Sequence, residues 1–93
     1  MNEKVLSLLG LARRAGKLTM GFDPVVDSVK TGQSRLVLIT SDISPKTEKE
    51  LRFSLRNSEI QLLGIPFDVA STGKALGKAA KIISVDDEGL RVP

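Results

Sequence analysis

Two kinds of hydrophobic spacing alternate along this chain of 93 residues. Helical spacing opens the sequence, where apolar residues recur at i, i+3, i+4 and i+7: Val5, Leu8, Leu9 and Ala12. Extended segments of strand length follow at residues 17–20, 35–40, 60–65 and 82–85, and the last three are nearly continuous apolar runs. Because such runs are typical of strands covered on both faces, the pattern predicts a buried sheet with helices packed on it.

Capping residues set the ends of the first two predicted helices. Asn2 is placed to cap the first helix, and Gly16 is placed just past its end. The second helix is predicted to begin with Asp23 as its cap and Pro24 at the first helical position, and to end at Gly32. Its inward residues are predicted to be valines: Val25, Val26 and Val29.

The same signals predict a third helix. Ser44 is a capping residue followed directly by Pro45, and the helix is expected to run to about Asn57. Leu51 and Leu55 are four residues apart, so they share the face that turns inward.

Asp68 predicts the start of a fourth helix that continues through Ala79. Gly73 and Gly77 lie inside this range, and each weakens a helix by about 1 kcal/mol relative to alanine. The last apolar run leads into an acidic segment, residues 86–89. Because this segment lacks the alternating ligand spacing of a calcium loop, we interpret it as a solvated turn.

The order of these elements predicts the fold class. Helices alternate with buried strands, which is typical of α/β proteins, and we predict a three-layer α/β/α sandwich around a small mixed sheet. No linker, repeat or low-complexity segment interrupts the pattern, so residues 1–93 are expected to form a single domain.

Composition narrows the functional classes. The chain has no cysteine and no histidine, and its only aromatic residues are three phenylalanines. Disulfides, thiolate metal sites and cysteine nucleophiles are thereby excluded, and the commonest acid–base side chain is missing. We therefore expect no catalytic residue, no metal site, no cofactor and no small-molecule substrate.

Charge is distributed unevenly along the chain. Residues 1–81 contain thirteen basic and eight acidic residues, whereas residues 82–93 contain one and three. A basic surplus of this size suits a polyanionic partner without proving one. No apolar run approaches the roughly 20 residues that cross a bilayer, and the start of the chain does not resemble a signal peptide. A cytoplasmic monomer is expected.

The glycine-rich stretch at residues 16–24 is the first candidate site. Gly21 precedes a predicted helix start, where free backbone N–H groups and the helix dipole attract phosphates. Arg13, Arg14 and Lys17 lie close by in sequence. An ordinary turn is the alternative, because a glycine before a helix cap is common.

A lysine series is the second candidate. Lys74, Lys78 and Lys81 are spaced i, i+4, i+7, which places them on one face of the predicted fourth helix. That face is either simply solvated or a contact for a nucleic-acid backbone. Successive base stacking on a single strand is disfavoured, since so few aromatic residues are present, but recognition of a folded RNA by shape stays open.

Three segments, in this order, resemble the ribosomal protein L7Ae family, in its small bacterial YlxQ-like branch. They are Leu9-Gly10-Leu11-Ala12-Arg13-Arg14-Ala15-Gly16-Lys17-Leu18 with Gly21, then Leu36-Val37-Leu38-Ile39 with Ser41-Asp42-Ile43-Ser44, and finally Leu76-Gly77-Lys78-Ala79. The resemblance covers nearly the whole chain. It implies an α/β/α sandwich that binds RNA, typically kink-turns, and that is often associated with the ribosome.

In that family, a G-x-N-E-x-x-K signature at the start of the second helix contacts the kinked RNA, and a loop near the end of the fourth helix packs on an extruded nucleotide. This chain keeps Gly21 but has Asp23, Pro24 and Asp27 in place of Asn, Glu and Lys. Aspartate only accepts hydrogen bonds and repels phosphate, and proline has no polar side chain. At roughly 1–3 kcal/mol per lost base contact, these changes are expected to weaken kink-turn binding.

Our leading hypothesis is a non-enzymatic, ribosome-associated RNA-binding protein that recognises folded, kink-turn-like RNA, with ribosomal RNA as one candidate. The expected contacts are the turn before the second helix and the end of the fourth helix. The candidate contacts are Arg13, Arg14, Lys17, Gly21, Phe22, Asp23, Lys78 and Lys81. The alternative is a protein–protein interaction module that kept the fold and lost the RNA site.

Overall fold

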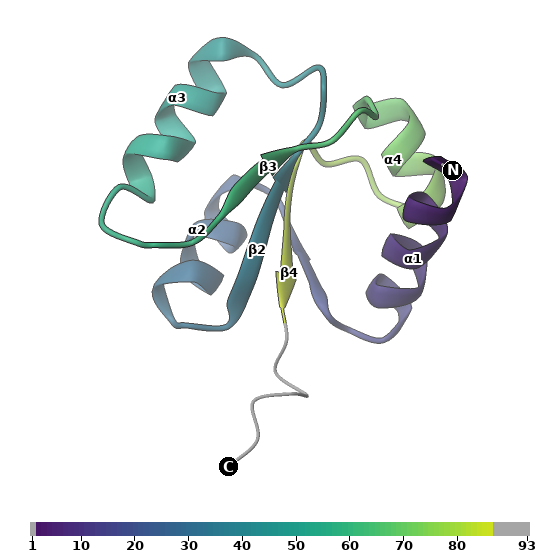
Figure 1. Ribbon diagram of the computed structural model, residues 1–93, viewed down its shortest axis with the longest axis horizontal. Helices are drawn as coiled ribbons and strands as arrows, with labels where there is room; N and C mark the ends of the chain where they lie inside the picture. The colour runs from purple at the N-terminus through teal and green to yellow at the C-terminus, as the bar shows by residue number, and fades with distance from the viewer. Residues whose placement is uncertain (1, 87–93) are drawn as a thin grey trace.

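The computed structural model describes residues 2–86, with side chains from Lys4 onward. Its elements, in chain order, are α1 (Asn2–Arg14), β1 (Leu18–Met20), α2 (Phe22–Lys30), β2 (Ser34–Ile39), α3 (Pro45–Ser54), β3 (Leu62–Gly64), α4 (Val69–Leu76) and β4 (Ile82–Asp86). The strands form one sheet in the order β1-β4-β2-β3 (Figure 1).

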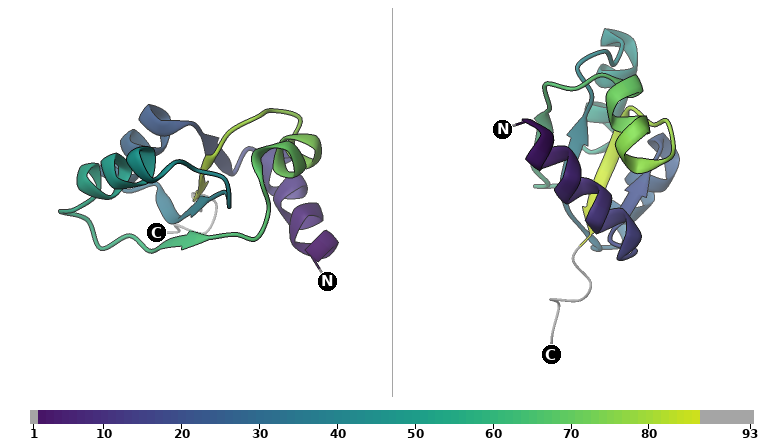
Figure 2. Two further views of the ribbon diagram at one scale, coloured as in Figure 1. Left: turned by 90° about the horizontal axis from the view of Figure 1, so that it is seen from above. Right: turned by 90° about the vertical axis from the view of Figure 1, so that its right-hand side faces the viewer.

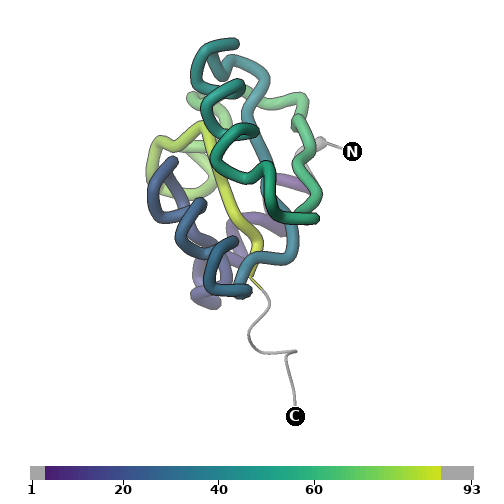
Figure 3. The backbone as a smooth tube through the Cα atoms, turned by 90° about the vertical axis from the view of Figure 1, so that its left-hand side faces the viewer, coloured from purple at the N-terminus to yellow at the C-terminus, as the bar shows by residue number. Residues whose placement is uncertain are grey.

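Helices cover both faces of this sheet. Figure 2 shows α2 and α3 on one side and α1 and α4 on the other, and Figure 3 looks onto the layer formed by α2 and α3. The predicted three-layer α/β/α sandwich is confirmed. The sheet is mixed, because β4 pairs antiparallel with both β1 and β2, whereas β2 and β3 are parallel.

Because of the strand directions, four chain segments lie together at one end of the strands. Strands β1, β2 and β3 finish at this end of the sheet, and β4 begins there. We call it the loop end, and it comprises residues 21–23, 40–44, 65–68 and 77–81.

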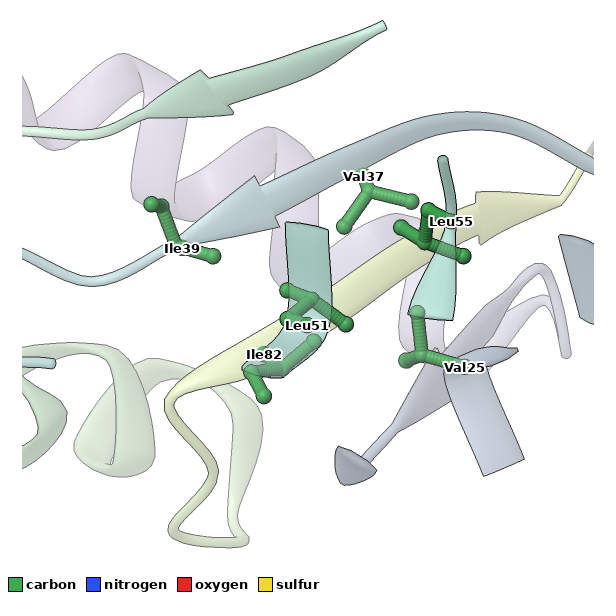
Figure 4. Packing of buried hydrophobic residues seen from close by; sticks show 6 residues of the cluster. All are labelled: Val25, Val37, Ile39, Leu51, Leu55 and Ile82. Atoms are coloured by element: carbon green, nitrogen blue, oxygen red, sulfur yellow. The ribbon is translucent and has the colours of Figure 1, made fainter. Parts of the chain in front are cut away.

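Alternating side chains of the central strands supply a core to each helical layer. Val37 and Ile39 of β2 face α2 and α3, where Val25 and Leu51 are fully buried (Figure 4). Leu38, between them, faces the opposite way and packs with residues of α1 and α4. This alternation explains the continuous apolar run of β2, since both of its faces are covered.

Several predicted helix ends are confirmed. Ser44 accepts a hydrogen bond of 3.1 Å from the N–H of Thr47, and Asp68 accepts one of 2.8 Å from the N–H of Ser71. Gly16 follows the end of α1 with a φ of 75°, a conformation that favours glycine. Helix α3 ends at Ser54, slightly before the predicted end at about Asn57.

The prediction that Asp23 caps the second helix is wrong. Helix α2 begins at Phe22 with Gly21 as its N-cap, and no side chain caps it. Asp23 and Pro24 therefore lie inside the first turn. Pro24 is tolerated there because the first four N–H groups of a helix have no partner within the helix.

The fourth helix is also shorter than predicted. It ends at Leu76, because Gly77 adopts a left-handed conformation with a φ of 79° and its N–H bonds back to the carbonyl of Gly73. Ala79 and the two lysines on either side of it lie outside the helix. Gly77 therefore ends the helix rather than only weakening its interior, because glycine readily adopts the left-handed conformation.

Two apolar patterns bury less than their spacing predicted. Val5 and Leu8 of α1 are 43% and 55% exposed, whereas Leu9 is buried. Strand β3 lies at the edge of the sheet, where Leu63 is 42% exposed. Asp86 belongs to β4, and the rest of the predicted acidic turn lies outside the described residues.

None of the helices within residues 2–86 combines the length and the apolar character needed to cross a bilayer.

Candidate nucleic-acid interface

Backbone hydrogen bonds bring the first and last strands together at the loop end. The N–H of Gly21 donates to the carbonyl of Ile82 at 2.9 Å, and the N–H of Thr40 donates to the carbonyl of Lys81 at 3.0 Å. Lys81 is therefore held between the ends of β1 and β2, and its exposed side chain emerges at the middle of the loop end.

Gly21 has a backbone conformation that other residues rarely adopt. Its φ is 105° and its ψ is 158°, and its carbonyl accepts the first hydrogen bond of α2, from the N–H of Val25. The N–H groups of Phe22 and Asp23 belong to the first turn, where N–H groups have no partner within the helix, and no side chain caps them. The sequence analysis expected free N–H groups near Gly21 but also expected Asp23 as the cap, and the structure has Gly21 at the cap position instead.

Two of the predicted contacts at this helix start are constrained by their surroundings. Phe22 is half-buried and packs against the core formed by α2 and α3, so its ring is not a free stacking surface. Asp23 is exposed in the first turn, where its negative carboxylate interacts favourably with the positive end of the helix dipole. This carboxylate also opposes the approach of a phosphate to the same N–H groups.

The turn after α4 places the lysines differently from the predicted helix face. Lys74 is in α4, Lys78 is in the turn that follows Gly77, and Lys81 directly precedes β4. The predicted common face of the three is therefore wrong. The turn after α4 folds back on the helix and comes so close that a Cβ at Gly73 would lie 3.4 Å from the Cα of Ala79.

A carboxylate that the sequence analysis assigned no role completes the loop end. Asp42 follows β2 and accepts a hydrogen bond of 3.1 Å from the N–H of Val69. The Thr40 hydroxyl beside it, this N–H and the nearby Lys81 ammonium hold the pKa of Asp42 below its ordinary value of 3.8. The Thr40 hydroxyl is buried and makes no hydrogen bond of ordinary geometry within residues 2–86. Asp42 is thus ionised at neutral pH, and its place in the polar segment that follows a buried strand was the signal for it.

The remaining candidates do not join this group. Arg13 donates a hydrogen bond of 2.6 Å to the carbonyl of Leu76 and so caps the end of α4. Lys17 precedes β1, with its carbonyl bonded to the N–H of Asp86, so it lies at the opposite end of that strand, roughly 13 Å from Gly21. Arg14 lines a hollow between α1 and α4.

The loop end therefore unites Gly21, Phe22, Asp23, Lys78 and Lys81, and it excludes Arg14 and Lys17. Arg13 lies beside it, bonded to the last residue of α4. Its charge is mixed rather than uniformly basic. Across residues 2–86, no group of three or more acidic side chains is arranged to hold a metal ion.

Comparison with known proteins identifies the family. The model of the ribosomal protein L7Ae/L30e/S12e/Gadd45 family matches residues 3–89. The chain belongs to this family. The resemblance drawn from the three sequence segments is thereby confirmed.

Relatives within and near the YlxQ-like branch agree with this assignment. The chain is 32% identical to the RNA-binding protein YlxQ of Bacillus subtilis over 83 residues, which cover 88% of this chain and 82% of that protein. A solved structure from Bacillus halodurans, of a protein with unknown function, is 38% identical with a TM-score of 0.79 over 90% of this chain and 85% of that one.

A more distant structure shares the fold of this L7Ae-family chain. The 15.5kD RNA binding protein of Giardia lamblia is 17% identical with a TM-score of 0.75, over 90% of this chain and 72% of that one. At this level of identity the likeness shows the fold alone.

Proposed function

We propose that this protein binds folded RNA through the loop end and performs no catalysis. The observation that carries the proposal is the convergence of Gly21, the uncapped start of α2 and Lys81 at one edge of the sheet. Family membership supports it, as do the names of the Bacillus subtilis relative and the Giardia lamblia structure, both of which are RNA-binding proteins.

The geometry offers two complementary contacts to an RNA backbone. The N–H groups of Phe22 and Asp23 provide hydrogen-bond donors at the positive end of a helix dipole. Lys78 and Lys81 provide cations on the neighbouring turn, and both are exposed. A backbone that bends between these two contacts satisfies both, which favours a kinked RNA over a straight duplex.

The altered signature limits the expected strength of this binding. Asp23 and Asp27 are exposed carboxylates on α2, and Pro24 removes one N–H from its first turn. We therefore propose a kink-turn-like RNA with weaker and more salt-dependent binding than the intact signature would give. A segment of ribosomal RNA is the candidate ligand, bound in the cytoplasm by a monomer.

Titration of a kink-turn RNA and of an unkinked duplex of equal length, each at two salt concentrations, tests the proposal. The double variant Lys78→Ala/Lys81→Ala is expected to lower the slope of log affinity against log salt concentration by about 2. The matched control Lys30→Ala/Lys49→Ala removes the same charge from α2 and α3, away from the loop end, and should leave the slope unchanged. Equal binding of both RNAs, or equal effects of both double variants, would contradict the proposal.

A second function is favoured by the carboxylates on α2. Asp23 and Asp27 give the start of α2 a negative surface that suits a protein partner better than RNA. This chain would then be a protein–protein interaction module with an inherited fold. A partner that stays bound after nuclease treatment supports this function, whereas release of all partners by nuclease removes it.

A further inference from the structure

The outer surface of α1 exposes large aliphatic side chains in a regular series. Val5, Leu8 and Leu11 are 43%, 55% and 54% exposed, and they follow one another at intervals of three residues. Such spacing forms one oblique row on a helix surface. The right-hand view of Figure 2 shows α1 facing the viewer with α4 beside it and no other element in front. No element within residues 2–86 covers the row.

A shallow hollow of about 390 Å³ adjoins this row, between α1 and α4. Its walls include Leu6, Leu11, Arg14 and Ala75. Gly10 forms the floor, because the two helices approach so closely that a Cβ there would lie 3.3 Å from the carbonyl oxygen of Ala75. We call the row and the hollow together the α1–α4 groove.

Exposed basic side chains lie on the two helices that form the groove, and one of them, Arg14, lines the hollow itself. Lys4, Arg14 and Lys74 are exposed on its two helices, and the side chains of residues 4–14 and 69–76 include no carboxylate. A second copy of this surface would bring like charges together across a two-fold axis, which disfavours a symmetric dimer. The complementary partner is acidic.

The aliphatic row favours one of two possible acidic partners, an RNA or an acidic protein helix. Bases of single-stranded RNA stack on aromatic rings, and residues 4–14 and 69–76 contain none. A phosphate backbone would pair with Lys4 and Arg14 but would leave Leu8 and Leu11 in water. A helix with an apolar face and acidic flanks covers the row and pairs with the cations at the same time.

We propose that the α1–α4 groove binds an acidic amphipathic helix of a protein partner. Its apolar face would rest on Val5, Leu8 and Leu11, with one side chain in the hollow above Gly10. Its carboxylates would lie against Lys4, Arg14 and Lys74. This surface is separate from the loop end, so one chain would hold RNA and a protein segment together.

A designed peptide tests the proposal directly. The probe is a helical peptide with leucine at i, i+3, i+4 and i+7 and glutamate elsewhere, and amide chemical shifts of the labelled protein report where it binds. Saturable binding is expected, with shifts concentrated in α1 and α4. A peptide with lysine in place of glutamate should bind at least about tenfold more weakly, because its charges repel those around the groove.

Variants locate the contact. Leu8→Ser/Leu11→Ser should weaken the peptide by about tenfold or more while leaving the RNA titration unchanged, and both side chains are exposed enough to be replaced without loss of the core. Leu63→Ser is the control and should change nothing, because Leu63 is also an exposed leucine but lies on β3. Absence of binding, shifts outside α1 and α4, or equal affinity of the double variant would overturn the proposal, as would dimerisation through this surface or loss of RNA affinity in the double variant.

Discussion

The N–H of Gly21 donates a 2.9 Å hydrogen bond to the carbonyl oxygen of Ile82 and thereby fastens the start of α2 to the start of β4. The two residues are far apart in sequence. Gly21 adjoins the N–H groups at the start of α2, and Ile82 adjoins the lysines of the turn before β4, which are the two halves of the candidate interface. Because Met20 is also paired with Ile83, the two halves form one rigid unit at the edge of the sheet. An RNA contacting both halves would therefore meet a preorganised surface.

Gly21→Ala is predicted to destabilise the protein by about 1–3 kcal/mol, because a residue with a Cβ is strained at a φ of 105°. No clash adds to this strain, since the nearest atom to the added Cβ, Cδ of Pro24, lies at 3.5 Å. Urea unfolding measures the change. Gly64→Ala is the control, because Gly64 has no positive φ and open space around it, and equal losses in both variants would contradict the explanation.

Arg13→Ala is predicted to lower stability by about 1 kcal/mol and to leave RNA affinity unchanged, because Arg13 caps the carbonyl end of α4 at Leu76. Arg14→Ala removes the same charge from the neighbouring position and should not affect stability. Thermal unfolding and RNA titration of both variants check this. A loss of RNA affinity specific to Arg13→Ala, without a loss of stability, would restore Arg13 as a contact.

Asp86→Ala is predicted to destabilise the protein by about 2 kcal/mol. The Asp86 carboxylate accepts hydrogen bonds of 2.5, 2.9 and 2.7 Å from the hydroxyls of Thr19, Ser28 and Ser84, which join β1, α2 and β4. Removing it leaves the Thr19 and Ser28 hydroxyls without their acceptor, while the Ser84 hydroxyl keeps its bond to Ser34. Asp27→Ala, which removes an exposed carboxylate of α2, is the control in the same unfolding assay, and a similar loss in both would argue against the network.

Thr40→Val is predicted to raise the pKa of Asp42 towards its ordinary value of 3.8, because the Thr40 hydroxyl is the largest cause of the lowered pKa. A lowered pKa in the folded state stabilises the fold above the unfolded pKa, and this contribution disappears as the pH falls through the folded pKa. The variant should therefore lose less stability than the parent protein on acidification. Carboxyl NMR shifts measured across the acid range give the pKa directly, and an unchanged value would contradict the prediction.

Local signals in the sequence were sufficient for most of the fold. Ser44 and Asp68 cap their helices because their side chains need only a neighbouring N–H, and the run at Val37–Ile39 is buried because both of its faces are covered. The errors arose where a glycine conformation decided the outcome. Gly21 replaced Asp23 as the cap, and Gly77 ended α4 before Lys78 and Lys81, since a positive φ is not visible in the spacing of side chains.

The candidate site was harder to predict than the fold for a geometric reason. Residues near Gly21 in sequence, such as Lys17, are carried to the far end of β1, whereas Lys81 is brought to Gly21 by strand pairing. Proximity in sequence is a poor guide across a strand, because each residue advances the chain by about 3.3 Å. Asp42 was missed for the same reason, since Val69 and Lys81 meet it only in the folded chain.

The most direct test of RNA binding at the loop end is to map the contact surface by amide chemical shifts during titration with a kink-turn RNA. The largest shifts are predicted at residues 21–23, 40–42 and 78–82, with those of α3 unchanged. The result that would contradict the account is the reverse: shifts confined to helix surfaces away from the loop end, or no shifts at low salt and at RNA concentrations far above those that saturate an intact L7Ae-family signature.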